Sequence, residues 1–350
     1  MSSSTEQDKA FIEQGTADYR KATFALFCAG LATFALLYSV QPILPELAAY
    51  FSVTSASSSL ALSVTTFSLA FGLLIAGALS ESWGRKPVMV VALLIACVLG
   101  IASALTTSWE WLLVLRTLLG LALSGLPALA MAYVGEEFDP KSLPVAMGLY
   151  IGGTALGGLL GRLLAGVLND LGGWSLALGG IASIGLLACV MFMWLLPRSR
   201  HFVAQPLSLR GLASNFKRHL MNPELRILFL LSFLLMGCFV ALFNYIGFYL
   251  SIEPFNLSST VIGFLFLVYL FGILSSNWSG KLVTRFGPVR VLVGSLLIML
   301  SGTVMCLIVW LPALILGLAL FTIGFFAAHA VASGLVGQKA GTARAQASAL

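Results

Sequence analysis

The chain has 350 residues, of which 59% are hydrophobic and 9% are charged, and its formal net charge is +6. An ordinary soluble domain has about 25% charged residues, and even a soluble domain of about 300 residues leaves about a quarter of its chain's surface exposed to water. This composition excludes a soluble globular protein and indicates an integral membrane protein whose excess basic residues meet anionic lipid headgroups, not nucleic acid.

The first 21 residues are polar and carry charges of both signs. The apolar run that follows is long enough to span a bilayer and has no small-residue cleavage pattern before a mature domain, so we predict no cleaved signal peptide. We expect residues 1–21 to stay in the cytoplasm as a short disordered lead.

Long uncharged runs alternate with short charged breaks along the rest of the chain. A helix that crosses the ~30 Å hydrocarbon core of a bilayer needs about 20 apolar residues. The runs predict ten spans, at residues 22–44, 59–79, 87–106, 111–134, 143–167, 174–196, 226–250, 260–279, 289–309 and 312–336.

The breaks between these spans alternate in charge. Those near Glu46, Glu110, Asp170 and Glu253 contain no Lys or Arg. The other breaks are basic, and they contain Arg85 and Lys86, Lys141, the cluster at 198–226, then Lys281, Arg285 and Arg290, and finally Lys339 and Arg344. Because loops rich in Lys and Arg remain on the cytoplasmic side, this pattern predicts a cytoplasmic N-terminus.

The chain also repeats itself. Gly77 and Gly84 follow the second span, and Gly280 and Gly287 follow the eighth at an offset of 203 residues, which is typical of a duplicated unit. We expect an N-terminal six-helix bundle at 22–196, a basic cytoplasmic linker at 197–225 with one amphipathic helix over 207–219, and a C-terminal bundle at 226–350. The second bundle would hold four spans, and the repeat predicts two further spans beyond Leu350.

The loop after the second span reads Gly77-Ala78-Leu79-Ser80-Glu81-Ser82-Trp83-Gly84-Arg85-Lys86-Pro87. It resembles the signature loop of the major facilitator superfamily, G-x-L-a-D-r-x-G-r-k, with Glu81 where Asp is usual and Ser82 where a base is usual. The resemblance covers residues 22–350 and implies an all-α membrane fold of two pseudo-symmetric six-helix bundles.

The candidate gating residues of this loop are Gly77, Glu81, Gly84, Arg85 and Lys86. Gly84 permits a tight turn between two helices. The resemblance implies that Glu81 interacts with the N-terminal end of an eleventh helix, a charge–dipole contact that would hold the cytoplasmic side closed. The alternative is that Arg85 and Lys86 only determine topology.

Two arginines lie inside predicted spans. Arg116 resembles the superfamily's fourth-helix arginine, in the pattern R-x-x-x-G with Gly120. A charge at mid-bilayer costs about 2.5–3.5 kcal/mol on insertion scales, so Arg116 either faces a cavity or a partner, or reaches outward to the headgroups. Arg162, in the fifth span, is a second candidate cavity base or a partner for Asp170.

Gly153, Gly157 and Gly161 fall four residues apart in the fifth span, on one helix face that a neighbouring helix can approach closely. This run is similar to the glycine-rich fifth helix of the superfamily's antiporters and drug-efflux members, although it lacks their Gly-Pro. Close packing against a neighbouring helix explains these glycines as well as a relation to the efflux members does.

Tyr38 and Gln41 close the first span. Together with Gly161-Arg162 and the segment 325–329, they resemble the arabinose-efflux-permease branch of the superfamily. Gln41 would then be a buried amide on a cavity-lining helix.

His329 is the one histidine inside a predicted span. A titratable imidazole at that depth is either a proton carrier or a hydrogen-bonded packing residue. Asn244 and Tyr245, in the seventh span, are candidate hydrogen-bond partners of a substrate.

These features predict a secondary transporter that moves a small solute by alternating access, with proton-coupled efflux as the leading mode. An uptake symporter or a facilitator on the same fold is the alternative, because no Asp or Glu lies deep within a span. A membrane-embedded enzyme is a remote alternative, since the three histidines are dispersed and no catalytic cluster is visible. We predict no cofactor and no metal site.

The expected partners are a small-molecule substrate, protons and membrane lipid, with no nucleic acid, and the protein is expected to be a monomer in the bacterial inner membrane. The candidate cavity residues include two arginines, an amide and a histidine, which favours anionic or neutral solutes over organic cations. On this interpretation Arg116→Ala abolishes transport and leaves membrane insertion intact.

Overall fold

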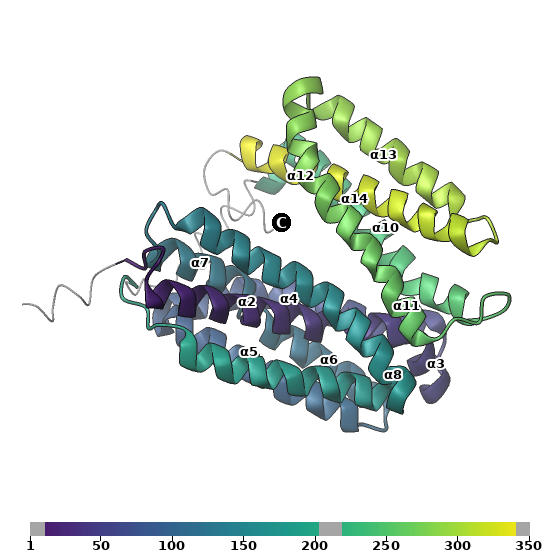
Figure 1. Cartoon of the computed structure of the whole chain (residues 1–350), viewed down its shortest axis with the longest axis horizontal. Coiled ribbons are helices and arrows are strands. Elements are labelled where there is room, and N and C mark those ends of the chain that lie inside the picture. Colours follow the sequence, from purple (N-terminus) through teal and green to yellow (C-terminus); the bar gives the residue numbers. More distant parts are fainter. Residues whose placement is uncertain (1–10, 203–218, 341–350) are drawn as a thin grey trace, which may run out of the picture. The chain divides into compact units, whose positions relative to one another are not determined.

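The computed structural model describes residues 11–202 and 219–340. Helices make up the regular structure of this part of the chain (Figure 1). They are α2 (Ala17–Tyr38), η1 (Gln41–Ile43), α3 (Leu44–Phe51), α4 (Ser55–Trp83), α5 (Arg85–Leu105), α6 (Trp109–Leu123), α7 (Pro127–Glu137), α8 (Leu143–Leu195), α10 (Pro223–Ser251), α11 (Ser259–Leu265), η2 (Phe266–Val268), α12 (Tyr269–Phe286), α13 (Pro288–Met305) and α14 (Leu311–Lys339).

Nine helices within the described ranges are long and apolar enough to cross a membrane. One of them, α8, has 53 residues. At about 1.5 Å per residue it would be about 80 Å long, far more than one crossing of a ~30 Å core requires. Gly172 and Gly173 have non-helical backbone angles in its middle, so α8 corresponds to two of the expected spans, joined at a kink.

Residues 11–21 differ from the expected disordered lead. Thr16 caps α2, because its hydroxyl accepts a hydrogen bond from the backbone N–H of Tyr19, and the helix begins at Ala17. Ile12 forms a parallel bridge with Phe138 and is 3% exposed. Burial of an apolar side chain therefore orders residues 11–16. Most of the expected amphipathic helix at 207–219 lies outside the described residues.

The chain divides into two compact units. The first unit contains residues 1–207 and also takes in 247–264, which the sequence places in the second bundle. The second unit contains residues 208–246 and 265–350. We distinguish the two ends of the helices in the first unit by charge: the basic end carries Arg85 and Arg198, and the acidic end carries Glu110 and Asp170.

In the first unit, α2 and the first half of α8 lie side by side (Figure 1). A Cβ added to Gly153, Gly157 or Gly161 would fall between 2.2 and 2.5 Å from an atom of α2. The nearest atoms, in that order, belong to Phe27, Leu31 and Ala35. Both sets advance by four residues in the same direction, so the two helices run parallel and only glycine fits between their backbones.

The two copies of the repeated turn have the same backbone. Gly84, between α4 and α5, has φ 90° and ψ 156°, and Gly287, between α12 and α13, has φ 81° and ψ 155°. Each glycine closes its helix by donating its N–H to the carbonyl four residues earlier, in Ser80 and Val283. A positive φ of this kind is available to glycine at no steric cost, so the repeated glycine marks a repeated turn.

Candidate functional site

Three of the sequence-predicted site residues meet at the end of α2. The Nε of Arg162 donates to the Oε1 of Gln41 at 2.7 Å, and its Nη1 donates to the carbonyl of Gly158 at 2.5 Å. The guanidinium carbon lies 4.0 Å from the centre of the Tyr38 ring. Arg162 and Gln41 are 3% and 2% exposed. We call Tyr38, Gln41 and Arg162 the Arg162 cluster.

Local sequence explains how the cluster forms. The glycine face of α8 brings Arg162 close to α2, and Gly158, one turn earlier, leaves room for the guanidinium. Pro42 stands at the start of η1 and helps to end α2, so that Gln41 lies just beyond Tyr38. The result is a buried cation held by an amide oxygen and an aromatic face, two contacts that suit the planar guanidinium.

Arg116 has a different environment. Its Nε donates to the carbonyl of Ala61 at 3.0 Å, and its two terminal nitrogens donate to the carbonyls of Leu36 at 3.2 Å and Leu37 at 2.9 Å. Leu36 and Leu37 lie in the last turn of α2, where helix carbonyls lack intrahelical donors and a positive charge is favourable.

The side chain of Arg116 is 1% exposed. Its guanidinium therefore has main-chain partners inside the first unit, as one of the expectations required, and a role in a solute cavity stays a prediction. It cross-links α2, α4 and α6 through main-chain atoms.

At the acidic end, α8 is joined to the segment 247–264. The carboxylate of Asp170 accepts hydrogen bonds from the backbone N–H groups of Ser259 at 3.1 Å and Thr260 at 2.8 Å, at the start of α11. The amide of Asn169 donates to the hydroxyl of Ser259 at 3.0 Å. A Cβ on Gly166 would lie 2.3 Å from the carbonyl of Ser259, so the backbones approach closely here as well.

At the basic end, the turn at Gly84 places Arg85 beside α7. The Nη2 of Arg85 lies 2.8 Å from a carboxylate oxygen of Glu136, and its Nε lies 3.2 Å from the same oxygen. The ammonium of Lys86 donates to the carbonyl of Leu196. The side chain of Glu81 lies outside the described residues, as does the packing around Gly77, so their gating roles stay predictions.

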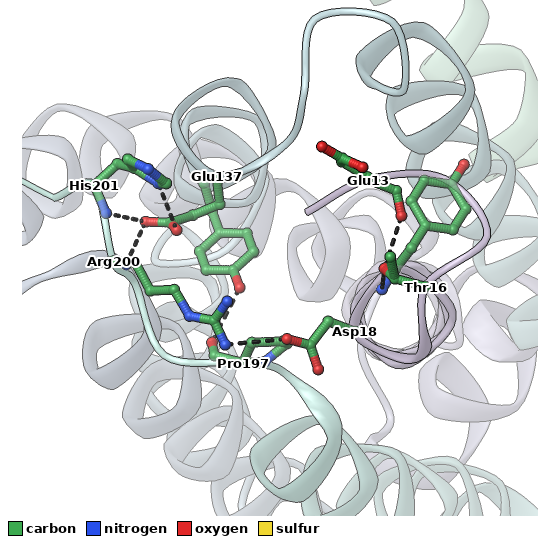
Figure 2. Close-up of polar contacts among 9 residues, drawn as sticks. Glu13, Thr16, Asp18, Glu137, Pro197, Arg200 and His201 are labelled. Atoms are coloured by element: carbon green, nitrogen blue, oxygen red, sulfur yellow. Dashed lines mark hydrogen bonds and ion pairs between the residues drawn. The ribbon is translucent and has the colours of Figure 1, made fainter. Parts of the chain in front are cut away.

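A second cluster at the basic end surrounds Glu137, which is 1% exposed (Figure 2). Its carboxylate accepts the backbone N–H groups of Arg200 at 2.7 Å and His201 at 2.9 Å, and it contacts the Nδ1 of His201 at 3.2 Å. Figure 2 also shows the guanidinium of Arg200 directed at Asp18, 3.0 Å away. Sequence reasoning missed this cluster, whose only signal is the adjacent Glu136 and Glu137 at the end of a span.

The remaining predicted residues lie in the second unit. The ring of His329 stacks on Phe325, with centroids 5.5 Å apart, and its buried Nδ1 has no hydrogen-bond partner among the described residues. Asn244 is 3% exposed and the adjacent Tyr245 is 42% exposed, so these neighbours on α10 point in different directions. The described ranges contain no group of three or more His, Cys, Asp and Glu arranged to hold a metal.

Comparisons with known proteins identify the family of this chain. The family model described as Major Facilitator Superfamily matches residues 23–350. The uncharacterized MFS-type transporter YybF of Bacillus subtilis (strain 168) is 47% identical over 340 residues, which cover 97% of this chain and 84% of that protein. The inner membrane transport protein YnfM of Escherichia coli (strain K12) is 47% identical over 347 residues, which cover 99% of this chain and 83% of that protein.

A solved structure shows the same fold. The crystal structure of a bacterial homolog to the human lysosomal transporter Spinster, in an inward-facing and unoccupied conformation, aligns with a TM-score of 0.77. The alignment covers 96% of this chain and 78% of that chain at 18% sequence identity. At this identity the likeness extends to the fold alone.

Proposed function

Because the chain belongs to the Major Facilitator Superfamily and is a multi-pass secondary transporter, not an enzyme, we propose that it exports a small anionic or neutral solute in exchange for protons. The proposed location is the bacterial inner membrane, in line with the name of the Escherichia coli relative. The basic end would face the cytoplasm, because Lys and Arg favour that side, and the N-terminus would lie there too.

The Arg162 cluster carries the proposal for the solute. Among the residues whose burial the structure describes, the buried charged side chains are Arg116, Glu137 and Arg162, and Glu137 is engaged by His201 at the basic end. The fixed charge near the end of α2 is therefore positive. A guanidinium recognises a carboxylate or phosphate group in two-point contact, and a ring such as that of Tyr38 offers a face for an apolar part of the solute.

In this proposal Gln41 orients the guanidinium of Arg162, and Arg162 attracts the solute. Asn244 and Tyr245 of the second unit are further proposed residues of the translocation route. Arg116 has a supporting role, since its donors are directed at main-chain carbonyls.

His329 is the proposed proton carrier. Its buried Nδ1 lacks a hydrogen-bond partner in the described part of the chain, and a nitrogen in that state has capacity to accept a proton. The stacked ring of Phe325 orients the imidazole without supplying a competing hydrogen bond.

The polar contacts at the two ends of the first unit support alternating access. Opening the acidic end would require Asp170 to release the N-terminus of α11. At the basic end, Arg85 and Glu136 hold the turn at Gly84 against α7. We propose that this ion pair breaks when the basic end opens. Alternating release of these contacts would expose a central solute to one side at a time.

A facilitator is the second candidate, and one observation favours it. Glu137 is the only buried Asp or Glu among residues of described burial, and it lies at the basic end, away from the Arg162 cluster. A transporter without a buried acid can move its solute down a gradient without protons.

The test is a flux assay in vesicles that contain the purified protein and an internal pH-sensitive dye. Small carboxylates, sugar phosphates, neutral sugars and organic cations are added in turn under an imposed proton gradient. Proton movement that depends on an anionic or neutral solute supports the proposal, and solute movement without proton movement establishes the facilitator. Transport confined to organic cations would overturn the assigned solute class.

The matched variant in this assay is His329→Phe, which keeps an aromatic ring beside Phe325 and removes the titratable group. It is expected to lose proton movement and to retain solute exchange. Unchanged proton movement in this variant would exclude His329 as the carrier.

A further inference from the structure

A cavity of about 540 Å³ opens at the basic end of the first unit, between the start of α2 and the end of α8. Its lining includes three basic residues, Lys21, Arg198 and Arg200, and one acidic residue, Asp18. Lys86 adds a fourth cation close by, because its ammonium donates to the carbonyl of the lining residue Leu196. The cavity is therefore a site of concentrated positive charge.

Two of these cations are available to a ligand. Arg200 is bonded to Asp18 through its guanidinium and to Glu137 through its backbone N–H, which fixes the position of its main chain (Figure 2). Lys21 and Arg198 are exposed, and neither has an ion-pair partner among the described residues. One carboxylate therefore faces three cations, and the excess charge favours an anion.

The surroundings of the cavity identify the kind of anion. Trp194 forms part of the lining and is 79% exposed at the end of a membrane-crossing helix. An indole in that position is typical of the boundary between headgroups and hydrocarbon. Met191 and Leu187 are 41% and 67% exposed on the same face of α8, one and two turns further from the basic end. An apolar track thus leads from the basic cavity into the hydrocarbon layer.

We infer that this cavity binds the headgroup of an anionic phospholipid. The phosphate is held by Lys21 and Arg198, beside the Arg200–Asp18 pair, and an acyl chain lies along Trp194, Met191 and Leu187. A free phosphate ion would use the cations alone, whereas a phospholipid also uses the exposed apolar face. This site is separate from the Arg162 cluster and does not depend on the nature of the transported solute.

The test titrates detergent-solubilised, full-length protein with phosphatidylglycerol, phosphatidylcholine or inorganic phosphate, and counts bound lipid by native mass spectrometry. Phosphatidylglycerol is expected to bind more tightly than phosphatidylcholine. Each basic residue near a membrane contributes about 1 kcal/mol to anionic lipid binding, which is about fivefold in affinity. Lys21→Gln and Arg198→Gln are each expected to weaken phosphatidylglycerol binding about fivefold.

The matched control is Arg290→Gln, which removes one exposed basic charge at the start of α13, outside the cavity. It is expected to leave phosphatidylglycerol binding unchanged. Equal losses in Arg198→Gln and Arg290→Gln would overturn the site in favour of general charge attraction. Equal binding of the two lipids would overturn the anionic preference, and competition by inorganic phosphate at the lipid's own concentration would exclude a role for the acyl chain.

Discussion

Arg162 donates a hydrogen bond to Gln41 across 121 residues of chain, with 2.7 Å between the Nε and Oε1 atoms. The same guanidinium lies over the ring of Tyr38. This pairing joins the first half of α8 to the turn that follows α2, and both partners are buried. The amide oxygen can only accept, so it fixes the plane of the guanidinium.

The first prediction separates charge from geometry at this position. Arg162→Lys keeps the charge but loses the planar fork and the stacking on Tyr38, and we expect about a tenfold lower initial rate of transport. Arg162→Gln removes the charge, and transport should fall to background. Rates are measured in vesicles and normalised to folded protein. Wild-type transport by Arg162→Gln would exclude this residue from the route.

Arg116 is expected to behave differently from Arg162. Arg116→Gln loses charge-assisted hydrogen bonds to three buried main-chain carbonyls. The free energy of unfolding should fall by about 2–4 kcal/mol, given about 1.5–3 kcal/mol for a hydrogen bond to a charged group and smaller values in membranes. Thermal unfolding in detergent measures the change. An unaltered midpoint together with lost transport would return Arg116 to the solute route.

The third prediction concerns the contact between α2 and α8. A Cβ at Gly157 would lie 2.2 Å from the carbonyl oxygen of Leu31, whereas one at Gly152 meets nothing within 4 Å. Gly157→Ala must push two backbones apart and should cost about 1–3 kcal/mol of stability. Gly152→Ala is the control and should be neutral or slightly stabilising. Similar unfolding midpoints for the two variants would contradict the close packing.

The ion pair between Arg85 and Glu136 predicts that exchanging the two charges restores transport lost in the single variants. Arg85→Glu places two acids together, and Glu136→Arg places two bases together, so each variant should transport more slowly than the wild type. The double variant restores the attraction and should recover much of the rate. Because the partners are only partly buried, the coupling energy is expected to be about 1 kcal/mol or less. Additive losses in the double variant would show that the pair does not act as a unit.

Asp170 offers a test by hydrogen exchange. Its carboxylate accepts the N–H groups of Ser259 and Thr260, and losing such a helix cap costs about 1 kcal/mol. Asp170→Ala should therefore speed amide exchange about fivefold in a peptide covering residues 257–264, read by mass spectrometry. Glu253→Ala removes an acid from the same end and serves as the control. Equal exchange in wild type and Asp170→Ala would show that the carboxylate does not hold α11.

Several features were predictable from the sequence because their causes are local. Hydropathy and length predict the spans, and the family match and the structural likeness confirm the all-α membrane fold. The spacing of Gly153, Gly157 and Gly161 selects one helix face, and glycine at position 84 indicates a turn with positive φ. The kink in α8 is also local, since Gly172 and Gly173 stand together after Asp170.

The partners of the charged residues were not predictable in this way. Arg85 pairs with Glu136, 51 residues away, and no spacing rule connects them. The sequence indicates that Arg116 either has a partner inside the membrane or reaches the headgroups, but carbonyl groups occur in every residue and give no pattern to detect. The order of residues 11–16 depends on the docking of Ile12 beside Phe138, which is again a distant contact.

The glycine contact between α2 and α8 has a consequence for transport energetics. Where the two backbones touch directly, no side chains lie between them to slide or repack, so α2 and the first half of α8 are expected to move as one rigid body. Tyr38 and Gln41 would then move together with Arg162. A solute seated on these three residues keeps the same contacts with them throughout the cycle. An exporter must change its affinity for the solute between the two states of its cycle. On this proposal, that change in affinity originates in the second unit.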